Sequence, residues 1–182
     1  MRSDLGATRL PRAPIWRRAS AFAIDFFCAW LPGSLVLGSG AKAQLLRSLL
    51  FLIVWVALRI FVSYRNQGQS LGRWLLDVKV IDTKLLRSAD LLALLKREGY
   101  LAFSALFVDI GLSSWRLIRQ GWIVLLIVPL ALDLGLAIAD SLNQHALHDR
   151  LAGTSVIQSS RGYSLDLKLK RLLAEVSRRV KK

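Results

Sequence analysis

The sequence predicts an all-α membrane protein with four transmembrane helices, amphipathic interfacial helices and a small cytoplasmic pair of strands. Two observations predict this fold class. Hydrophobic residues make up 54% of the 182 positions and lie in long runs, and the basic residues behind the net charge of +14 lie between those runs. Long apolar runs separated by basic connections are typical of multi-spanning membrane proteins. Because membrane topology accounts for the basic charge, we expect no nucleic-acid partner.

The first span is expected at residues 18–37, after a polar, proline-containing arm at 1–17. Arg18 lies where this helix enters the membrane, and Asp25 lies two turns deeper on the same face. An acid at this depth costs about 3 kcal/mol on insertion scales. Another part of the chain must therefore compensate Asp25, and a two-turn separation is too long for Arg18 to do so directly.

The second span is expected at 45–64 and contains Arg59. Arg59 either extends to the cytoplasmic boundary or turns inward to meet an acid, and the sequence leaves both possibilities open. In the connection 65–99, the spacing of Leu71, Trp74 and Leu75 predicts a short helix, and residues 78–82 read as a strand. Ser88 is positioned to cap an amphipathic interfacial helix that leads into the third span.

The third span, at 100–115, contains Asp109, and the fourth, at 122–142, contains Asp133 and Asp140. Asp109 and Asp133 are the deeper acids and are candidates for meeting Arg59, whereas Asp140 is expected to be hydrated. The membrane domain extends to residue 158, and its segment 155–158 is expected to pair with 78–82. The tail, 159–182, predicts a basic amphipathic helix on anionic lipid of the inner leaflet. Its lipid-binding residues are Lys168, Lys170, Arg171, Arg178 and Arg179.

Basic residues also predict the orientation. Lys and Arg are concentrated before the first span, between the second and third spans and after the fourth, while the two remaining connections contain Lys42, Arg116 and Arg119. Because basic loops stay in the cytoplasm, we expect a multi-pass protein of the bacterial inner membrane with both termini cytoplasmic.

Three blocks resemble the RDD family of small bacterial membrane proteins. The block from Arg18 to Asp25 is similar to its opening helix, the block from Gln69 to Val80 to its cytoplasmic segment, and the block from His148 to Thr154 to its closing segment. The resemblance implies that Arg18, Asp25 and Asp149 are the arginine and two aspartates that name the family. It also implies a role in the membrane, with transport commonly suspected and cation/proton antiport proposed for some members. The sequence departs from the family pattern after Asp82, where a tight Asp-Gly turn is usual.

The ionisable residues have two interpretations. As a candidate ion or proton site, Asp25, Asp109, Asp133 and Arg59 would line a polar interior. Alternatively, Asp25 accepts bonds from a neighbouring helix and fixes helix packing. For Asp149 we expect a pairing with Arg18 across the inner surface.

No catalytic motif supports an enzyme, and we expect no cofactor. His145 and His148 are expected to be a solvated pair, not a metal site. The sequence therefore favours a cation- or proton-linked transport component. Four spans form only a thin wall around a transport pathway, so such a protein would need to form a homo-oligomer or to bind a partner membrane subunit. The alternative is a non-transporting scaffold or accessory subunit that binds anionic lipid or a partner protein.

Overall fold

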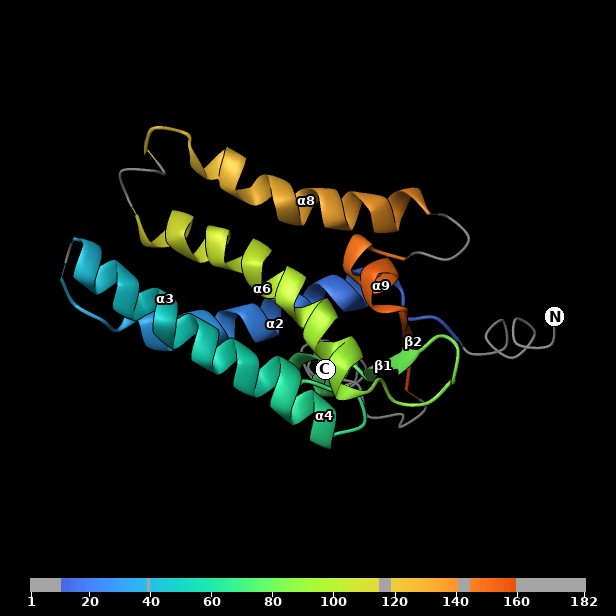
Figure 1. Ribbon diagram of the computed structural model, residues 1–182. Coiled ribbons are helices and arrows are strands. Elements are labelled where there is room, and N and C mark those ends of the chain that lie inside the picture. The colour runs from blue at the N-terminus through green and yellow to red at the C-terminus, as the bar shows by residue number, and fades with distance from the viewer. Residues whose placement is uncertain (1–10, 39, 115–118, 141–144, 160–182) are drawn as a thin grey trace, which may run out of the picture.

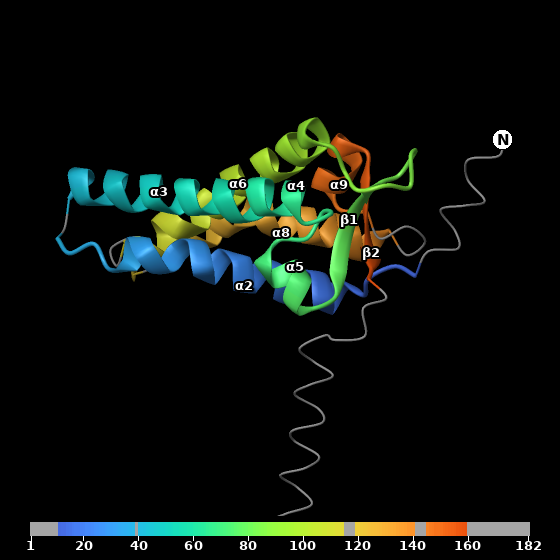
Figure 2. The same ribbon diagram turned by 90° about the horizontal axis from the view of Figure 1, so that it is seen from below.

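The computed structural model describes residues 11–38, 40–114, 119–140 and 145–159, and these residues are mostly helical. Figure 1 shows the long helices α2, α3, α6 and α8 running along one axis, with α9 and the strands β1 and β2 at one end. In Figure 2 the two strands cross that end of the bundle. The tail residues expected to bind lipid lie outside the described residues.

Helix α2 (Ile15–Ser34) is built around a stripe that repeats every four residues. Its buried residues are Arg17, Ala21, Asp25, Ala29 and Gly33. A spacing of four keeps them on one helical face, and the small members of the stripe let neighbouring backbone approach closely. A Cβ on Gly33, for example, would lie 3.2 Å from the carbonyl oxygen of Arg47. Asp25 is therefore held in a face that packs directly against the rest of the bundle.

The second long helix is continuous from Ala41 to Arg65. It consists of α3 (Ala41–Trp55), a π-helical segment η1 (Val56–Val62) and α4 (Ser63–Arg65). In the described part of the chain, it is the one helix long and apolar enough to cross a membrane by length and composition. The π-helical segment contains Arg59, whose side chain is buried, and such insertions often mark functional positions.

Helix α6 (Leu91–Ser113) corrects the sequence prediction of two separate elements. The expected interfacial helix and the third span form one helix, which begins after Asp90 and not after Ser88. The Asp90 carboxylate caps it by accepting a hydrogen bond from the Ala93 backbone N–H at 2.8 Å. The helix runs on through Arg97 and Glu98, which are good helix formers and are both buried and ion-paired.

The remaining elements complete the end of the bundle. They are α5 (Leu71–Leu75), β1 (Val78–Asp82), α8 (Ile123–Ala139), α9 (Leu147–Ala152) and β2 (Thr154–Gln158). The strands are antiparallel, with Val80 opposite Val156. The Ala13 backbone N–H donates to the Val156 carbonyl at 3.2 Å, so the segment before α2 lies against β2.

Two apolar clusters hold the elements together. Val78, Val80 and Val156 pack with Leu94 of α6 near the strands. A second cluster in the bundle contains Phe51 and Trp55 of α3 with Ala29, Leu101 and Ala105. Each cluster joins segments from both halves of the chain, so the bundle and the strand pair form one packed unit.

We expect Gly72→Ala to destabilise the protein. A Cβ at this position would lie 2.2 Å from the backbone carbonyl oxygen of Ala21, and backbone atoms cannot move aside cheaply. Overpacking of this kind typically costs about 1–3 kcal/mol. Thermal unfolding of the purified protein in detergent measures the effect. Gly99→Ala is the control, because nothing lies within 4 Å of its added Cβ. Equal melting temperatures for the two variants would contradict the close α2–α5 contact.

Candidate functional site

Asp25 is fully buried and receives three donors from two other elements. The Arg59 Nη1 lies 3.0 Å from Asp25 Oδ2, and the Ser70 hydroxyl donates to the same oxygen at 2.6 Å. The Gly72 backbone N–H donates to Oδ1 at 2.7 Å. Ser70 is also the N-cap of α5, where its hydroxyl oxygen accepts from the Arg73 backbone N–H. The carboxylate thus joins α2 to the π-helical segment and to the start of α5.

Glu98 lies at the centre of the buried charges and is fully buried itself. Arg59 Nε donates to Glu98 Oε2 at 2.6 Å, and Arg73 Nη2 donates to Oε1. Arg97 Nε also donates to Oε1, at 3.2 Å. Three guanidiniums from three elements therefore share one carboxylate of α6.

Arg97 extends the network to the strand end. Its Nη1 donates to Asp149 Oδ1 and, at 3.1 Å, to the Thr154 hydroxyl. Asp149 Oδ2 lies 3.7 Å from Arg18 Nη1. The contact between Arg18 and Asp149 agrees with the pairing expected from the sequence, although Arg97 lies closer to this carboxylate.

Asp133 of α8 is bonded to the start of α9. The His148 backbone N–H donates to Asp133 Oδ1 at 3.0 Å, and His148 Nδ1 lies 2.6 Å from Oδ2. His148 Nε2 in turn lies 3.7 Å from Asp149 Oδ1. His148 is only 8% exposed, so the expectation that it is solvated is wrong, whereas His145 is partly exposed. The fold places its ring between two carboxylates of neighbouring elements.

Together these groups form what we call the charge network. Its members are Arg18, Arg59, Arg73, Arg97, Asp25, Glu98, Asp133, Asp149 and His148. Four arginines face four acids, so their formal charges cancel when His148 is neutral. Such compensation lowers the free-energy cost of burying so many charges in an apolar bundle.

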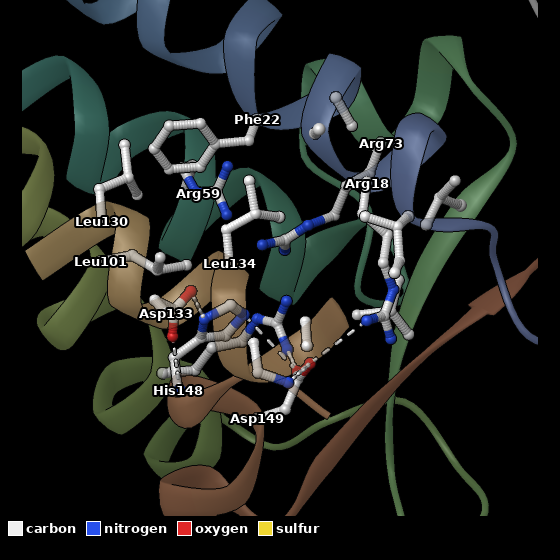
Figure 3. A pocket seen from close by; sticks show the side chains of 18 residues that line it. Arg18, Phe22, Arg59, Arg73, Leu101, Leu130, Asp133, Leu134, His148 and Asp149 are labelled. Atoms are coloured by element: carbon white, nitrogen blue, oxygen red, sulfur yellow. Dashed lines mark hydrogen bonds and ion pairs between the residues drawn. The ribbon is translucent and has the colours of Figure 1, made fainter. Parts of the chain in front are cut away.

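A cavity of about 150 Å³ lies against the charge network (Figure 3). Arg18 and Arg73 approach it on one side, and Phe22, Leu101 and Leu130 line the other. Residues of α2 and α8 face each other across it. Charged and apolar side chains thus both line the cavity, and the Arg59 guanidinium lies 5.3 Å from the centre of the Phe22 ring.

Burial and neighbouring charges shift the protonation of the groups on α5 and α9. Burial raises the pKa of Asp149, but Arg97, His148 and Arg18 together lower it to about 2. Burial lowers the pKa of His148, and Arg97 lowers it further, against the opposing influence of Asp149 and Asp133. Arg73 has a pKa lowered to about 10, by burial first and then by the nearby Arg59 and Arg97.

The structure brings together part of the predicted ion site and separates the rest. Arg59 turns inward, but it meets Asp25 and Glu98 and neither Asp109 nor Asp133. Asp109 instead accepts from the Ser48 hydroxyl at 3.3 Å. Asp25, Asp109 and Asp133 thus have three different sets of partners. Within the described ranges, no group of three or more His, Cys, Asp or Glu side chains could hold a metal ion.

Sequence reasoning missed Glu98, Arg73 and Arg97. All three lie in a polar connection that the sequence assigned to the membrane surface, and nothing in a local hydrophobic pattern distinguishes a buried charge there. Two features of the sequence could have pointed to these residues. Asp25 needed a compensating partner, and Arg73 lies in a block that resembles the RDD family. Asp140, expected to be hydrated, has a partly exposed contact with Arg150 at 3.2 Å.

The fold and the network define a helical domain with a buried cluster of compensated charge and one helix long and apolar enough to cross a membrane among the described residues. The RDD family profile matches residues 12–153, which confirms the resemblance of the three sequence blocks. The chain belongs to the RDD family. No curated protein and no solved structure is similar enough to this chain to match it.

Removing the Arg97 guanidinium should lower the stability of the fold. Arg97→Ala leaves Asp149 and Glu98 buried with less compensation, and breaking a buried ion pair typically costs about 3–5 kcal/mol. The melting temperature in detergent reports this loss. The matched control is Arg150→Ala, because Arg150 pairs with Asp140 but its side chain is 52% exposed. Exposed pairs contribute about 1 kcal/mol or less, so similar losses for both variants would refute the buried role of Arg97.

The His148 environment predicts a loss of stability in mild acid. Because its pKa is lowered from 6.5 in the folded protein, the unfolded chain binds the proton more readily. Stability is therefore present above pH 6.5 and falls as pH decreases toward the folded pKa. Melting temperatures measured from pH 7.5 to 5.5 should fall less steeply in His148→Gln.

The His145→Gln variant is the control for the other histidine, because burial also lowers the pKa of His145. We expect the larger change of slope with His148, which lies in contact with Asp133 and close to Asp149. Asp149 titrates in a separate window, between its usual value near 3.8 and about 2. A His148→Gln protein with the wild-type slope would contradict the prediction.

Proposed function

We propose that this RDD protein is a four-span inner-membrane scaffold or accessory subunit with both termini in the cytoplasm. The spans would be α2, the helix from Ala41 to Arg65, the second half of α6, and α8. In support, these helices run side by side, and the strands and α9 gather at one end (Figure 1). Residues 11–14, which precede α2, lie beside β2 at that end, and the connection from α4 to α6 begins there as well. Basic residues are concentrated in the sequence before α2 and in that connection, so the positive-inside rule makes this the cytoplasmic end.

The saturation of Asp25 favours this role over cation transport. The carboxylate accepts from Arg59, Ser70 and the Gly72 backbone at 2.6–3.0 Å, so a cation would have to displace an arginine before it could bind. A guanidinium in that position gives a fixed positive charge where a permeating cation would need a negative one.

The charge network is well placed to fix helix positions. It joins α2, the π-helical segment, α5, α6, α8, α9 and β2 through contacts between specific atoms, and each contact requires one particular register. Buried ionic groups often contribute less to stability than to the choice of one arrangement. We propose that this fixed arrangement of helices supports binding to two kinds of partner. The membrane-facing surface of the helices and the basic tail would bind anionic lipid and a partner protein, either a second copy or another membrane subunit.

Cation- or proton-linked transport is the competing proposal. One observation favours it: the Asp133–His148 pair lines the cavity and contains a histidine, the side chain that titrates most readily near neutral pH. Transport and scaffold differ in whether the purified protein moves ions.

The deciding experiment is ion flux in proteoliposomes containing the full chain. We expect sodium, potassium and proton flux equal to that of protein-free vesicles, and we expect Asp25→Asn to lower membrane abundance and melting temperature. The double variant Asp25→Asn/Arg59→Gln, which restores the charge balance, should recover part of that loss. Flux above background that Asp25→Asn abolishes would overturn the scaffold proposal in favour of a cation site.

A further inference from the structure

The turn that joins β1 to α6 projects from the end of the bundle that carries the strands. Figure 1 and Figure 2 both show this green segment reaching beyond β1 and β2, away from the long helices. Under the function proposed above, this end of the protein lies in the cytoplasm. The tip of the turn is therefore surrounded by water and by cytoplasmic proteins, and not by lipid.

Hydrogen bonds hold the turn in one conformation. The Asp82 carboxylate accepts from the backbone N–H groups of Lys84 and Leu85, at 2.7 and 2.9 Å. Thr83 fixes the turn to the end of α9, because its backbone N–H and its hydroxyl both donate to the Gly153 carbonyl, at 3.1 and 2.8 Å. A turn fixed in this way presents its side chains at a set position on the surface.

Two leucines occupy the tip of this turn. Leu85 is 59% exposed and Leu86 is 37% exposed, and neither belongs to the two apolar clusters of the fold. Leu86 also has a φ of 52°, in the left-handed region. That conformation costs free energy for a residue with a Cβ, and glycine, asparagine or aspartate is usual in turns. Leucine here adds strain without joining a core, as expected of a residue that contacts another molecule.

The surface around these leucines is apolar and basic. Leu91 and Leu92, at the start of α6, are 44% and 61% exposed. Lys84 and Arg87 flank the two leucines of the turn and are both exposed. The neighbouring acid, Asp82, directs its carboxylate to the backbone of the turn itself. An apolar surface with acidic residues at its margin would complement this arrangement, whereas a second copy of a chain with a net charge of +14 would repel it.

We propose that this turn docks a cytoplasmic protein that has an apolar pocket rimmed by acidic side chains. Leu85 and Leu86 enter the pocket, and Lys84 and Arg87 pair with the acids at its rim. Exposed apolar side chains outside the membrane mark protein-binding sites, and apolar anchors in pockets supply much of the affinity of an interface. The proposal rests on the cytoplasmic orientation of the proposed scaffold and names the class of its partner.

Photo-crosslinking of the full chain, in the cells that produce it, tests the proposal. The crosslinking amino acid p-benzoylphenylalanine replaces Leu85 in one chain and Leu45 in a control chain. Leu45 is 62% exposed and lies on α3 at the opposite end of the bundle. We expect a protein adduct from position 85 that position 45 does not give. Mass spectrometry should place this adduct beside apolar and acidic residues of the captured protein.

The captured protein is then purified and titrated against the full chain in phosphatidylcholine nanodiscs. Leu85→Ser should raise the dissociation constant at least about tenfold, because it removes an apolar anchor. Leu45→Ser makes the same change at a matched exposure and should leave the constant unchanged. The double variant Lys84→Glu/Arg87→Glu should weaken binding more at low salt than at high salt, since salt screens charge attraction. Equal affinities for Leu85→Ser and the unaltered chain would overturn the proposal.

Leu86→Asn separates binding from folding. Asparagine tolerates the left-handed conformation better than leucine does, so the melting temperature of this variant should not fall. Its dissociation constant should nevertheless rise at least about fivefold, because the apolar side chain is lost. A lowered melting temperature with unchanged affinity would make Leu86 a structural residue and contradict its role in docking.

Three crosslinking results would also overturn the proposal. An adduct with lipid would place the turn at the membrane surface, and an adduct with a second copy of this chain would make the turn a self-association site. No adduct above the level of position 45 would mean that no protein docks there. These results are distinct from failure of the scaffold role, which is decided by ion flux and its loss in Asp25→Asn.

Discussion

The described structure depends on the compensation of Glu98. This carboxylate is completely buried and is shared by Arg59, Arg73 and Arg97, which belong to three separate elements. A lone ionised carboxylate in an apolar bundle would cost many kcal/mol, and a lone buried guanidinium likewise. Each of these buried charges would destabilise the fold without its partners. The elements that supply them must therefore assemble in one arrangement.

The network also explains local features that otherwise look like irregularities. The π-helical segment contains the arginine that bridges Asp25 and Glu98, and α5 approaches α2 so closely that only glycine fits at position 72. That close approach brings the Gly72 backbone N–H within 2.7 Å of the Asp25 carboxylate. Local backbone geometry and charge compensation are therefore two aspects of the same constraint. The cavity lies against this cluster.

Much of the fold could be predicted from the sequence. Hydrophobic runs gave the long helices to within a few residues at most ends, since an apolar helix must satisfy its backbone internally. Alternation and length gave the strand at Val78–Asp82, and its antiparallel partner lies where expected. The error lay in the expected start of the third span at residue 100, because α6 runs unbroken from Leu91 to Ser113 with Arg97 and Glu98 buried inside it.

For the candidate site, the sequence by itself determined that Asp25 must be compensated, that Arg18 and Asp149 belong at one level, and that Arg59 had a possible inward role. These follow from the cost of isolated charge in an apolar segment. Only the tertiary structure decided the partners: Glu98 in place of Asp109 or Asp133 for Arg59, and Asp133 for His148. Partner choice depends on which faces of distant elements pack together, and contacts 15 to 52 residues apart are set by the register of packing and not by local pattern.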